Sequence, residues 1–332
     1  MLDAFSENLR HQRGVARDDV LSAVLATIRL SGSLQFCFMP TGEWQTDGVP
    51  RMAAMSGRPG GTMPFHVLAS GSCWLRIGGE ELELSEGDIV MFPFGTGHQL
   101  GVGLGGRLLT PILDLPPRPW REIPVLRYGA ASSAVTLLCG YLQCEGVSFA
   151  PLKQVLPELI HIRTSTAAAG DWLRTTVRQM VAEVDSPRVG GVSMLPRLTE
   201  IMFIEILRHQ ILAADPRATG WLAALADALL SRCLSLIHDD PGRDWSLEEL
   251  SAACGVSRSV LAERFQKTLG TSPIRYVREW RLYLASVALT TTGRTIAAIA
   301  FEAGYATEAA FNRAFSQAFG APPATWRAKA QS

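Results

Sequence analysis

The chain has 332 residues, of which 47% are hydrophobic and 19% are charged, and its 31 basic and 31 acidic residues give a formal net charge of zero at pH 7. This length and apolar share exclude a disordered chain and favour two or more folded domains. The charge balance excludes nucleic-acid binding through bulk positive charge, since even the residues from 225 onward carry only 12 basic against 10 acidic side chains.

The N-terminal residues, MLDAFSENLRHQRG, have neither the cationic start nor the apolar run of a signal peptide. No uninterrupted apolar run reaches the roughly 18 residues that a membrane helix needs. The sequence therefore predicts a cytoplasmic protein without a membrane partner. Six cysteines are present and none forms a Cys-x-x-Cys pair, so we expect free thiols and no structural zinc site.

The N-terminal half is predicted to be rich in β-strands. Residues 18–30 form a predicted helix, because two aspartates can cap it and apolar residues recur on one face. From 34 to 113, short apolar runs alternate with Gly, Pro and Asp, which is typical of an all-β barrel or sandwich. The Gly- and Pro-rich stretch 48–64 is predicted to be a long loop, and 134–146 to contain a further strand.

Helical periodicity follows and predicts four helices, at 151–162, 172–184, 194–212 and 221–238. The apolar residues of 194–212 exceed one amphipathic face, which favours burial on two sides. A homodimer contact is predicted there, and the alternative is a helix packed on both sides within the monomer. We therefore predict an α+β chain of two domains, a β-barrel with flanking helices and an all-α C-terminal domain. The predicted boundaries are 1–150 for the β-barrel domain, 151–224 for a helical linker or dimerisation segment, and 225–332 for the C-terminal domain.

The C-terminal part contains an internal repeat. LEELSAACGVSRSVLAERFQKTLGTSPIRY, from Leu247, parallels IAAIAFEAGYATEAAFNRAFSQAFGAPPATW, from Ile296. Apolar and glycine positions match at an offset of 49, and after one inserted residue the match continues at an offset of 50 as far as Pro273 and Pro323. Two copies of one structural unit are therefore expected.

Each copy predicts a helix, a glycine turn and a second helix, which is the geometry that places a helix in the DNA major groove. The residues predicted to cap and turn these helices are Ser246, Glu249, Gly255 and Ser257 in the first copy, and Thr295, Gly304 and Thr307 in the second. The residues that face away from the predicted core, and are therefore candidates for DNA contacts, are Arg258, Ser259, Ala262, Glu263, Gln266, Glu308, Ala309, Asn312 and Arg313.

Residues 276–289, between the two copies, form a predicted helix without a breaker that can hold the copies apart. If the copies lie about one turn of DNA apart, ~34 Å, they reach successive major-groove windows on one face of the duplex. A plain helical bundle with the same turns is the alternative, and the matched duplication favours DNA binding over it.

Residues 225–332 resemble the DNA-binding domain of the AraC/XylS family of bacterial regulators. The resemblance is carried by WSLEELSAACGVSRSVLAERFQKTLGTSPIRYVREWRL and IAAIAFEAGYATEAAFNRAFSQAFGAPPATWR. It implies binding to promoter DNA, contact with RNA polymerase and, most often, activation of transcription. The first reading helix departs from richer family members, because Ser259, Ala262 and Glu263 are poor donors; the second, with Asn312 and Arg313, is expected to read more bases.

The arginines of this domain are expected to divide into two roles. Arg313, together with Asn312, is expected to specify bases, and the alternative is that Arg313 holds a phosphate. The arginines expected to hold phosphates are Arg258, Arg275, Arg278 and Arg294.

Residues 87–98, GDIVMFPFGTGH, resemble the second cupin motif: Gly, five residues, Pro, one residue, Gly, two residues, His. His98 is therefore expected to point into a barrel. The resemblance to cupin sensor domains implies a small effector bound in that barrel, with His66, Trp74 and His98 as candidate pocket residues.

The first cupin motif is only half present, because Leu68 stands where the partner of His66 would be. Two histidines fall short of the three or four ligands that a catalytic metal needs, so we expect no metal, no other cofactor and no catalytic residue. The alternative is a metal-dependent cupin enzyme with an accessory DNA-binding domain, which would require ligands that the sequence does not reveal.

A thiol-based, redox-sensing regulator is a further alternative. Cys139 and Cys144 lie five residues apart, and Cys73 lies in a predicted barrel strand. Because no Lys, Arg or His lies within four residues of Cys139 or Cys144, burial as small apolar side chains is favoured. Cys233 and Cys254 fall in apolar helical patterns and are expected to lie in the core.

Overall fold

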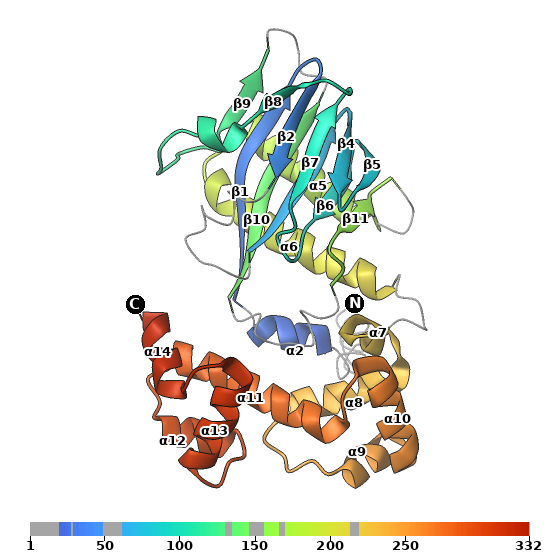
Figure 1. The fold of residues 1–332 in the computed structure, drawn as a ribbon, viewed down its shortest axis with the longest axis vertical. Helices are drawn as coiled ribbons and strands as arrows, with labels where there is room; N and C mark the ends of the chain where they lie inside the picture. The colour runs from blue at the N-terminus through green and yellow to red at the C-terminus, as the bar shows by residue number, and fades with distance from the viewer. Residues whose placement is uncertain are drawn as a thin grey trace, which may run out of the picture. The chain divides into compact units, whose positions relative to one another are not determined.

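The structure, a computed structural model, describes residues 20–27, 29–48, 62–129, 135–145, 156–165, 170–212 and 219–331. These form two compact units, each described by itself. The barrel unit consists of the described residues within 30–145 and 156–210, and the helical unit of those within 20–29 and 211–331. Figure 1 shows the strands gathered in the first unit and helices α7 to α14 in the second. Most of the predicted loop at 48–64 falls outside the described residues, and its last three residues already belong to a strand.

The barrel unit contains two β-sheets. In spatial order, the six-stranded sheet consists of β11 (Ile160–Arg163), β6 (Asp88–Met91), β3 (Thr62–Ser70), β10 (Thr136–Glu145), β1 (Arg29–Pro40) and β9 (Val125–Tyr128). The five-stranded sheet consists of β5 (Glu80–Ser85), β4 (Ser72–Ile77), β7 (His98–Val102), β2 (Trp44–Gly48) and β8 (Arg107–Leu109), and a 3₁₀ helix, η2 (Pro111–Asp114), follows β8. Buried apolar side chains of both sheets form one core, which confirms the predicted barrel.

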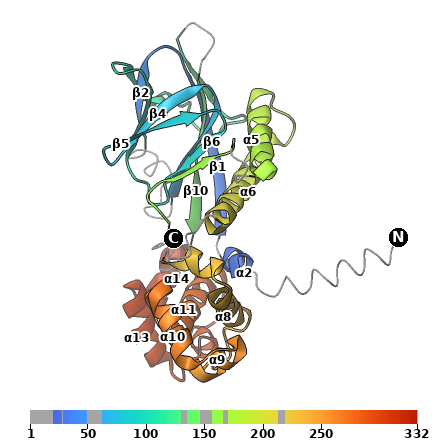
Figure 2. The ribbon, with the colours of Figure 1, turned by 90° about the vertical axis from the view of Figure 1, so that its right-hand side faces the viewer.

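Two helices, α5 (Gly170–Asp185) and α6 (Gly191–Leu212), accompany the six-stranded sheet in the barrel unit, as Figure 2 shows. Gly32 of β1 permits a close approach to α6, because a Cβ there would lie 2.6 Å from the carbonyl oxygen of Pro196. The predicted helices at 172–184 and 194–212 are confirmed.

The helix predicted at 151–162 is wrong at its C-terminal end, and residues 151–155 lie outside the described part. Ile160 and Ile162 belong to β11, which pairs antiparallel with β6, and both side chains are buried. Alternating isoleucines that complete a sheet gain more from burial than the local helical pattern offers.

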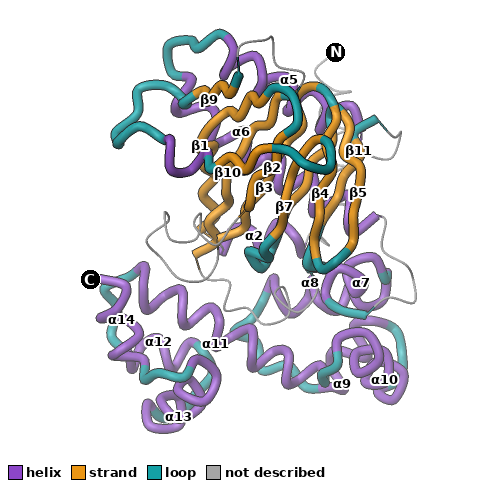
Figure 3. Tube along the Cα trace, turned by 45° about the horizontal axis from the view of Figure 1, so that its top comes forward, coloured by secondary structure: helices purple, strands orange, loops and turns teal. Residues whose placement is uncertain are grey.

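The helical unit places short helices around one long helix; Figure 3 draws these helices in purple. Its helices are α2 (Val20–Thr27), α7 (Trp221–Ala226), α8 (Ala228–Asp239), α9 (Leu247–Cys254), α10 (Arg258–Leu269), α11 (Pro273–Thr291), α12 (Ile296–Glu302), α13 (Glu308–Phe319) and α14 (Pro323–Gln331). None of the helices in the described ranges is long and apolar enough to span a membrane.

One predicted helix ends earlier than the sequence suggested, and another is divided in two. The first, predicted at 18–30, ends at Thr27, and β1 begins at Arg29. The helix predicted at 221–238 is broken at Asp227, whose carboxylate accepts hydrogen bonds at 3.0 Å from the backbone N–H groups of Leu229 and Leu230. This aspartate caps α8, so the chain starts a new helix there.

Candidate nucleic-acid interface and barrel interior

The first helix–turn–helix pair is built by local capping, as predicted. Ser246 Oγ accepts a hydrogen bond from the N–H of Glu249 at 3.1 Å, and the Glu249 carboxylate accepts one from the N–H of Ser246 at 2.9 Å. Gly255 ends α9 in the left-handed region, with φ of 71°. Ser257 then caps α10 by accepting from the N–H of Val260 at 3.3 Å.

The second pair repeats this geometry. Thr295 caps α12 and Thr307 caps α13, each by accepting from a backbone N–H at 3.2 Å. Gly304, at φ of 81°, forms the turn. In both copies the turn glycine bonds to the carbonyl three residues back, and the next N–H reaches five residues back, at 3.0–3.1 Å. The sequence repeat is therefore also a structural repeat.

One helix belongs to the cores of both copies. Toward its N-terminus, α11 buries Tyr276 and Trp280, and Tyr276 lies edge-on to Phe265 of α10. Toward its C-terminus it buries Leu282 and Leu289 in a cluster with Phe311 and other residues of the second copy. The two copies are thus held at a fixed separation by a shared, buried helix.

The part of the helical unit that contains both copies begins before the predicted boundary at 225. Trp221 of α7 is fully buried and donates from Nε1 to the hydroxyl of Tyr276 at 3.0 Å. Gly220 N–H also donates to the carbonyl of Thr268 at 2.6 Å. A segment starting at 225 would lack both contacts.

The predicted buried faces of the reading helices are confirmed, since Leu261, Phe265, Phe311 and Phe315 are buried. The candidate DNA-facing residues that are exposed are Arg258, Ser259, Glu263, Gln266, Glu308, Ala309 and Arg313. Ala262 and Asn312 are half-buried.

Asn312 is placed differently from Arg313. Its Oδ1 atom is buried and has no hydrogen-bond partner among the described residues. Bidentate recognition of adenine requires both the amide oxygen and the amide nitrogen of an asparagine, so this side chain would have to rotate before it could read a base.

The arginines divide by their partners. Arg275 pairs with Glu279 at 2.9 Å, and Arg294 pairs with both carboxylate oxygens of Glu302. Arg258, Arg278 and Arg313 are exposed and form no ion pair with another described residue. These three are the arginines of the predicted set whose charge is not already balanced by an acidic neighbour.

Three further arginines, which the sequence did not single out, tie the helical unit together. Arg264 of α10 pairs with the capping carboxylate of Asp227 at 2.9 Å. Arg327 of α14 donates to the carbonyl of Leu289 at 3.2 Å. Arg281 of α11 donates from Nε to the carbonyl of Pro241 at 2.6 Å. Of these three contacts, only the one to Asp227 involves a residue that the local sequence marks, because an aspartate is a typical N-cap of a helix.

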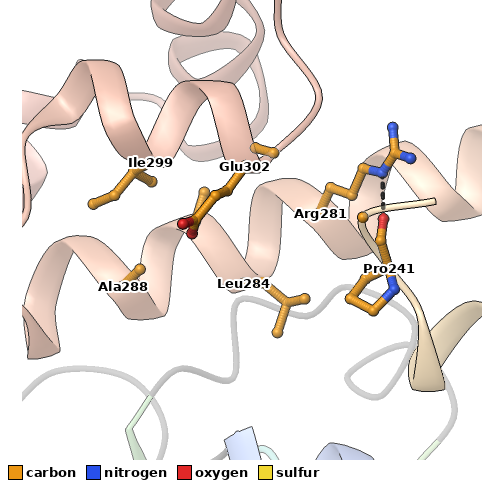
Figure 4. A pocket seen from close by; sticks show the side chains of 9 residues that line it. Pro241, Arg281, Leu284, Ala288, Ile299 and Glu302 are labelled. Atoms are coloured by element: carbon orange, nitrogen blue, oxygen red, sulfur yellow. Dashed lines mark hydrogen bonds between the residues drawn. The ribbon is translucent and has the colours of Figure 1, made fainter. Parts of the chain in front are cut away.

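Arg281 stands at one end of a groove of about 270 Å³ on the surface of α11 (Figure 4). Leu284 and Ala288 form its floor, and Ile299 and Glu302 of α12 form a wall. The groove lies where the loop before α9 and the helix α12 both meet α11. It therefore marks the junction of the two copies.

In the barrel unit, the cupin-like segment folds as its spacing predicts. Gly87 and Gly95 are left-handed, with φ of 89° and 67°, on either side of β6, and His98 starts β7 with its side chain buried. The second candidate, His66 of β3, is also buried, and its Nε2 lies 2.8 Å from Nε2 of His98.

These histidines belong to a buried chain of hydrogen bonds. His98 Nδ1 lies 3.0 Å from the carbonyl oxygen of Thr96, and His66 Nδ1 lies 3.1 Å from Sγ of Cys139. Phe92 stacks on the His98 ring at 3.6 Å with an interplanar angle of 4°. Burial lowers the pKa of His98 to about 4 and that of His66 well below its usual value, the nearby His98 contributing to the latter, so both rings are neutral.

The hydrogen positions in this chain follow from its acceptors. A carbonyl oxygen only accepts, so the neutral His98 carries its hydrogen on Nδ1 and accepts at Nε2. His66 must then donate from Nε2 and accept at Nδ1, which leaves the Cys139 thiol as the donor. The order is Cys139 S–H to His66, His66 N–H to His98, and His98 N–H to Thr96.

Trp74, the third predicted pocket residue, lies elsewhere. Its neighbours Cys73 and Leu75 point into the core, so alternation along β4 turns Trp74 outward. There it donates from Nε1 to the carbonyl of Gly103 at 2.8 Å, and Arg76 lies over its ring.

The residues present do not fit the metal that a cupin barrel can hold. His66 uses its two ring nitrogens in opposite directions, and Leu68, at the position of the missing partner, is a buried core residue. Among the described residues, no group of three or more His, Cys, Asp and Glu side chains is arranged to hold a metal ion. The described part of the barrel therefore offers no donor set for a three- or four-ligand site.

The barrel thiols named in the redox alternative are buried, as far as the structure describes them. Burial raises the pKa of Cys73 to about 12 and that of Cys139 well above its usual value. The side chain of Cys144 lies outside the described part. Cys233 and Cys254 are buried in the helical unit, as predicted.

Comparisons with known proteins agree with both parts. A family profile described as Cupin matches residues 19–212, and one described as Helix-turn-helix domain matches 250–329. A protein of Streptomyces antibioticus described as an AraC-like transcription regulator is 29% identical, over 93% of this chain and 98% of that protein. The HTH-type transcriptional regulator AlkR of Acinetobacter baylyi is 28% identical over 93% of this chain and 99% of that protein.

Among solved structures, an AraC-type transcriptional regulator from Chromobacterium violaceum is 28% identical, with 32% of this chain and 96% of that chain covered and a TM-score of 0.32.

Proposed function

This chain belongs to the AraC family of DNA-binding transcriptional regulators and, through its N-terminal part, to the cupin family, and from this premise we propose that it binds promoter DNA with both helix–turn–helix copies under the control of a small signal received by the barrel. The observation that carries the proposal is the repetition of caps, glycine turns and buried faces in two copies on one helix.

The shared helix supports simultaneous contact by both copies. With 19 residues, α11 is about 28 Å long at 1.5 Å per residue, which approaches the ~34 Å between successive major-groove windows. Because its side chains are buried in both cores, the spacing is rigid. We infer that the operator contains two half-sites one turn apart.

The proposal assigns base reading chiefly to Arg313. Its side chain is exposed, is not ion-paired within the described ranges, and projects from the face opposite the buried Phe311 and Phe315. Arg313→Ala is expected to cost about 1–3 kcal/mol of binding free energy and to relax the preference at one base pair, because a bidentate contact to guanine is lost. The measurement is binding to a library of operator variants at two salt concentrations.

Arg258→Ala is the matched control. Arg258 is exposed at the first turn of α10, where loss of a phosphate contact should weaken all operator variants alike and reduce the salt slope by about one. If Arg313→Ala behaves in the same uniform way, without a change in base preference, Arg313 holds a phosphate instead.

We further propose that the protein acts as a homodimer and activates transcription through RNA polymerase, as the resemblance to AraC-type regulators implies. One side of α6 is buried and the other bears Met194, which is exposed, and Ile201 and Ile204, which are half-buried. This remaining apolar surface is where the dimer contact is placed. A dimer is expected in sedimentation at micromolar concentration, and a monomer that stays monomeric on operator DNA would exclude it.

No enzymatic role is part of this proposal. The relatives are named as transcription regulators, and the histidines of the barrel form hydrogen bonds to each other and to a thiol in a geometry unsuited to a resident metal. The proposed location is the cytoplasm, where promoter DNA is found.

A further inference from the structure

A small cavity in the barrel borders two members of the buried hydrogen-bond chain, His66 and Cys139. The cavity next to His66 and Cys139 has a volume of about 20 Å³. A single water molecule needs at least roughly 10–15 Å³, so there is room beside the thiol for a small molecule. Its lining also includes Asp47, which is exposed, so the cavity lies near the surface of the barrel.

The thiol at the inner end of this cavity faces a base. Cys139 Sγ donates to His66 Nδ1 at 3.1 Å, and the opposite nitrogen of the same ring donates to His98 at 2.8 Å. When His66 takes the thiol proton, the imidazolium keeps both hydrogen bonds, and His98 passes part of the charge toward the carbonyl of Thr96. Because burial disfavours both charged forms, this proton transfer accompanies the attack of the sulfur and does not precede it.

We propose that Cys139 is a site of two-electron oxidation by a small peroxide, and that this oxidation is the signal that the barrel receives. The sulfur attacks one oxygen of hydrogen peroxide and an S–O bond forms as the O–O bond breaks. The thiol proton, held by His66, goes to the leaving hydroxide, which departs as water. Sulfur is oxidised to the sulfenic acid, the peroxide is reduced, and the cavity accommodates the added oxygen atom.

The other barrel thiols lack this arrangement. Cys73 points into the same core and Cys37 lines the opposite side of the six-stranded sheet, near α5. Neither has a described imidazole at hydrogen-bond distance. Both are buried, so they serve as internal controls for a reaction that depends on the base and not on access alone.

The inference rests on the proposed function, because it names the signal of the same barrel. Oxidation of Cys139 and binding of operator DNA are therefore measured separately, so that a failure of the inference can be told from a failure of the proposed function. The reduced full-length protein is treated with hydrogen peroxide or with the bulkier cumene hydroperoxide, then unfolded in a 1,3-dione that traps sulfenic acids. Mass spectrometry gives the extent of modification at each cysteine. Affinity for the operator is measured in parallel, before and after oxidation.

Hydrogen peroxide is expected to modify Cys139 at least about tenfold faster than Cys37 or Cys73, and cumene hydroperoxide is expected to modify it at least about tenfold more slowly. His66→Asn keeps an acceptor for the thiol but no base, and should slow the reaction at least about tenfold. Oxidation should change operator affinity by at least about threefold in the parent protein and not in Cys139→Ala. Thermal unfolding checks that both variants are folded.

Equal modification of all buried thiols, an unchanged rate in His66→Asn, or equal rates with the two peroxides would overturn the inference and leave DNA binding untouched. A stoichiometric metal that is lost in His98→Ala would also overturn the inference, because the two histidines would then be metal ligands and not a chain of hydrogen bonds. Absence of operator binding by the reduced and the oxidised protein, with Cys139 still selectively modified, would instead refute the proposed function.

Discussion

Phe315→Ala is expected to lower the free energy of unfolding of the helical unit by about 3–5 kcal/mol and to abolish operator binding near 37 °C. Phe315 is 0% exposed, and its ring lies against those of Phe311, Phe319 and Trp326 at centroid distances of 4.5–5.9 Å. Truncation loses this burial and leaves a cavity that three rigid rings cannot fill. The measurement is denaturant unfolding followed by helical circular dichroism.

The matched control is Phe301→Ala, on the neighbouring helix α12. Phe301 is 79% exposed, so its truncation should change the free energy of unfolding by no more than about 0.5 kcal/mol. If the two variants lost similar stability, the second copy would not have the core described here. If Phe301→Ala alone lost operator binding, the exposed ring would be a DNA contact.

Acidification from pH 7 to pH 5 is expected to cost the helical unit about 2 kcal/mol through His238. The ring is 7% exposed, stacks on Trp280 at 4.0 Å and lies 2.9 Å from the Tyr276 hydroxyl, and burial lowers its pKa to about 3. The unfolded chain, with a histidine pKa near 6.5, binds the proton first. The stability present above pH 6.5 is therefore lost progressively as the pH falls toward 3.

His238→Gln should remove most of this pH dependence, because glutamine can still meet the Tyr276 hydroxyl but does not titrate. Arg232→Gln, at an exposed position of the same helix, should leave the pH dependence unchanged. Hydrogen exchange of peptides from α8 and α11 at the two pH values measures the effect within the helical unit. An equal loss in His238→Gln and in the parent protein would place the sensitive group elsewhere.

The parts of the fold that were predictable from the sequence are those set by neighbours along the chain. The capping box at Ser246 and Glu249 and the left-handed Gly255 need only a few consecutive residues. The buried faces of α10 and α13 follow from the helical repeat alone. The duplication then favoured a DNA-binding domain over a plain helical bundle, because the same helix–turn–helix pattern occurs twice.

The parts that were missed depend on pairing between distant segments. Trp44–Gly48 is a short, mostly polar stretch that becomes β2 because it pairs with β7 on one side and with β8 on the other. Residues 160–163 become a strand because β6, about 70 residues earlier, offers them an edge. The outward position of Trp74, in contrast, was available from the alternation of β4, since Cys73 and Leu75 point inward.

The hydrogen bond between Cys139 and His66 in the barrel also depends on pairing between distant segments. The sequence indicated that no cationic or basic residue lies near Cys139 along the chain, which is correct, and yet a histidine is its hydrogen-bond partner. The antiparallel register of β10 with β3 places Cys139 directly opposite His66, 73 residues away. The half-buried position of Asn312 was likewise not predictable, because it depends on how α13 packs against its neighbours.

The shared helix α11 also makes the two DNA-reading copies a single folding unit. Local opening of either copy exposes residues of α11 that support the other, since Trp280 and Leu289 lie on the same 19-residue helix. Neither copy can therefore fluctuate to an open state at a free-energy cost set by its own contacts alone. Amides of α9 and α13 should therefore exchange with solvent hydrogen in the same cooperative event, as expected if the two copies bind DNA only together.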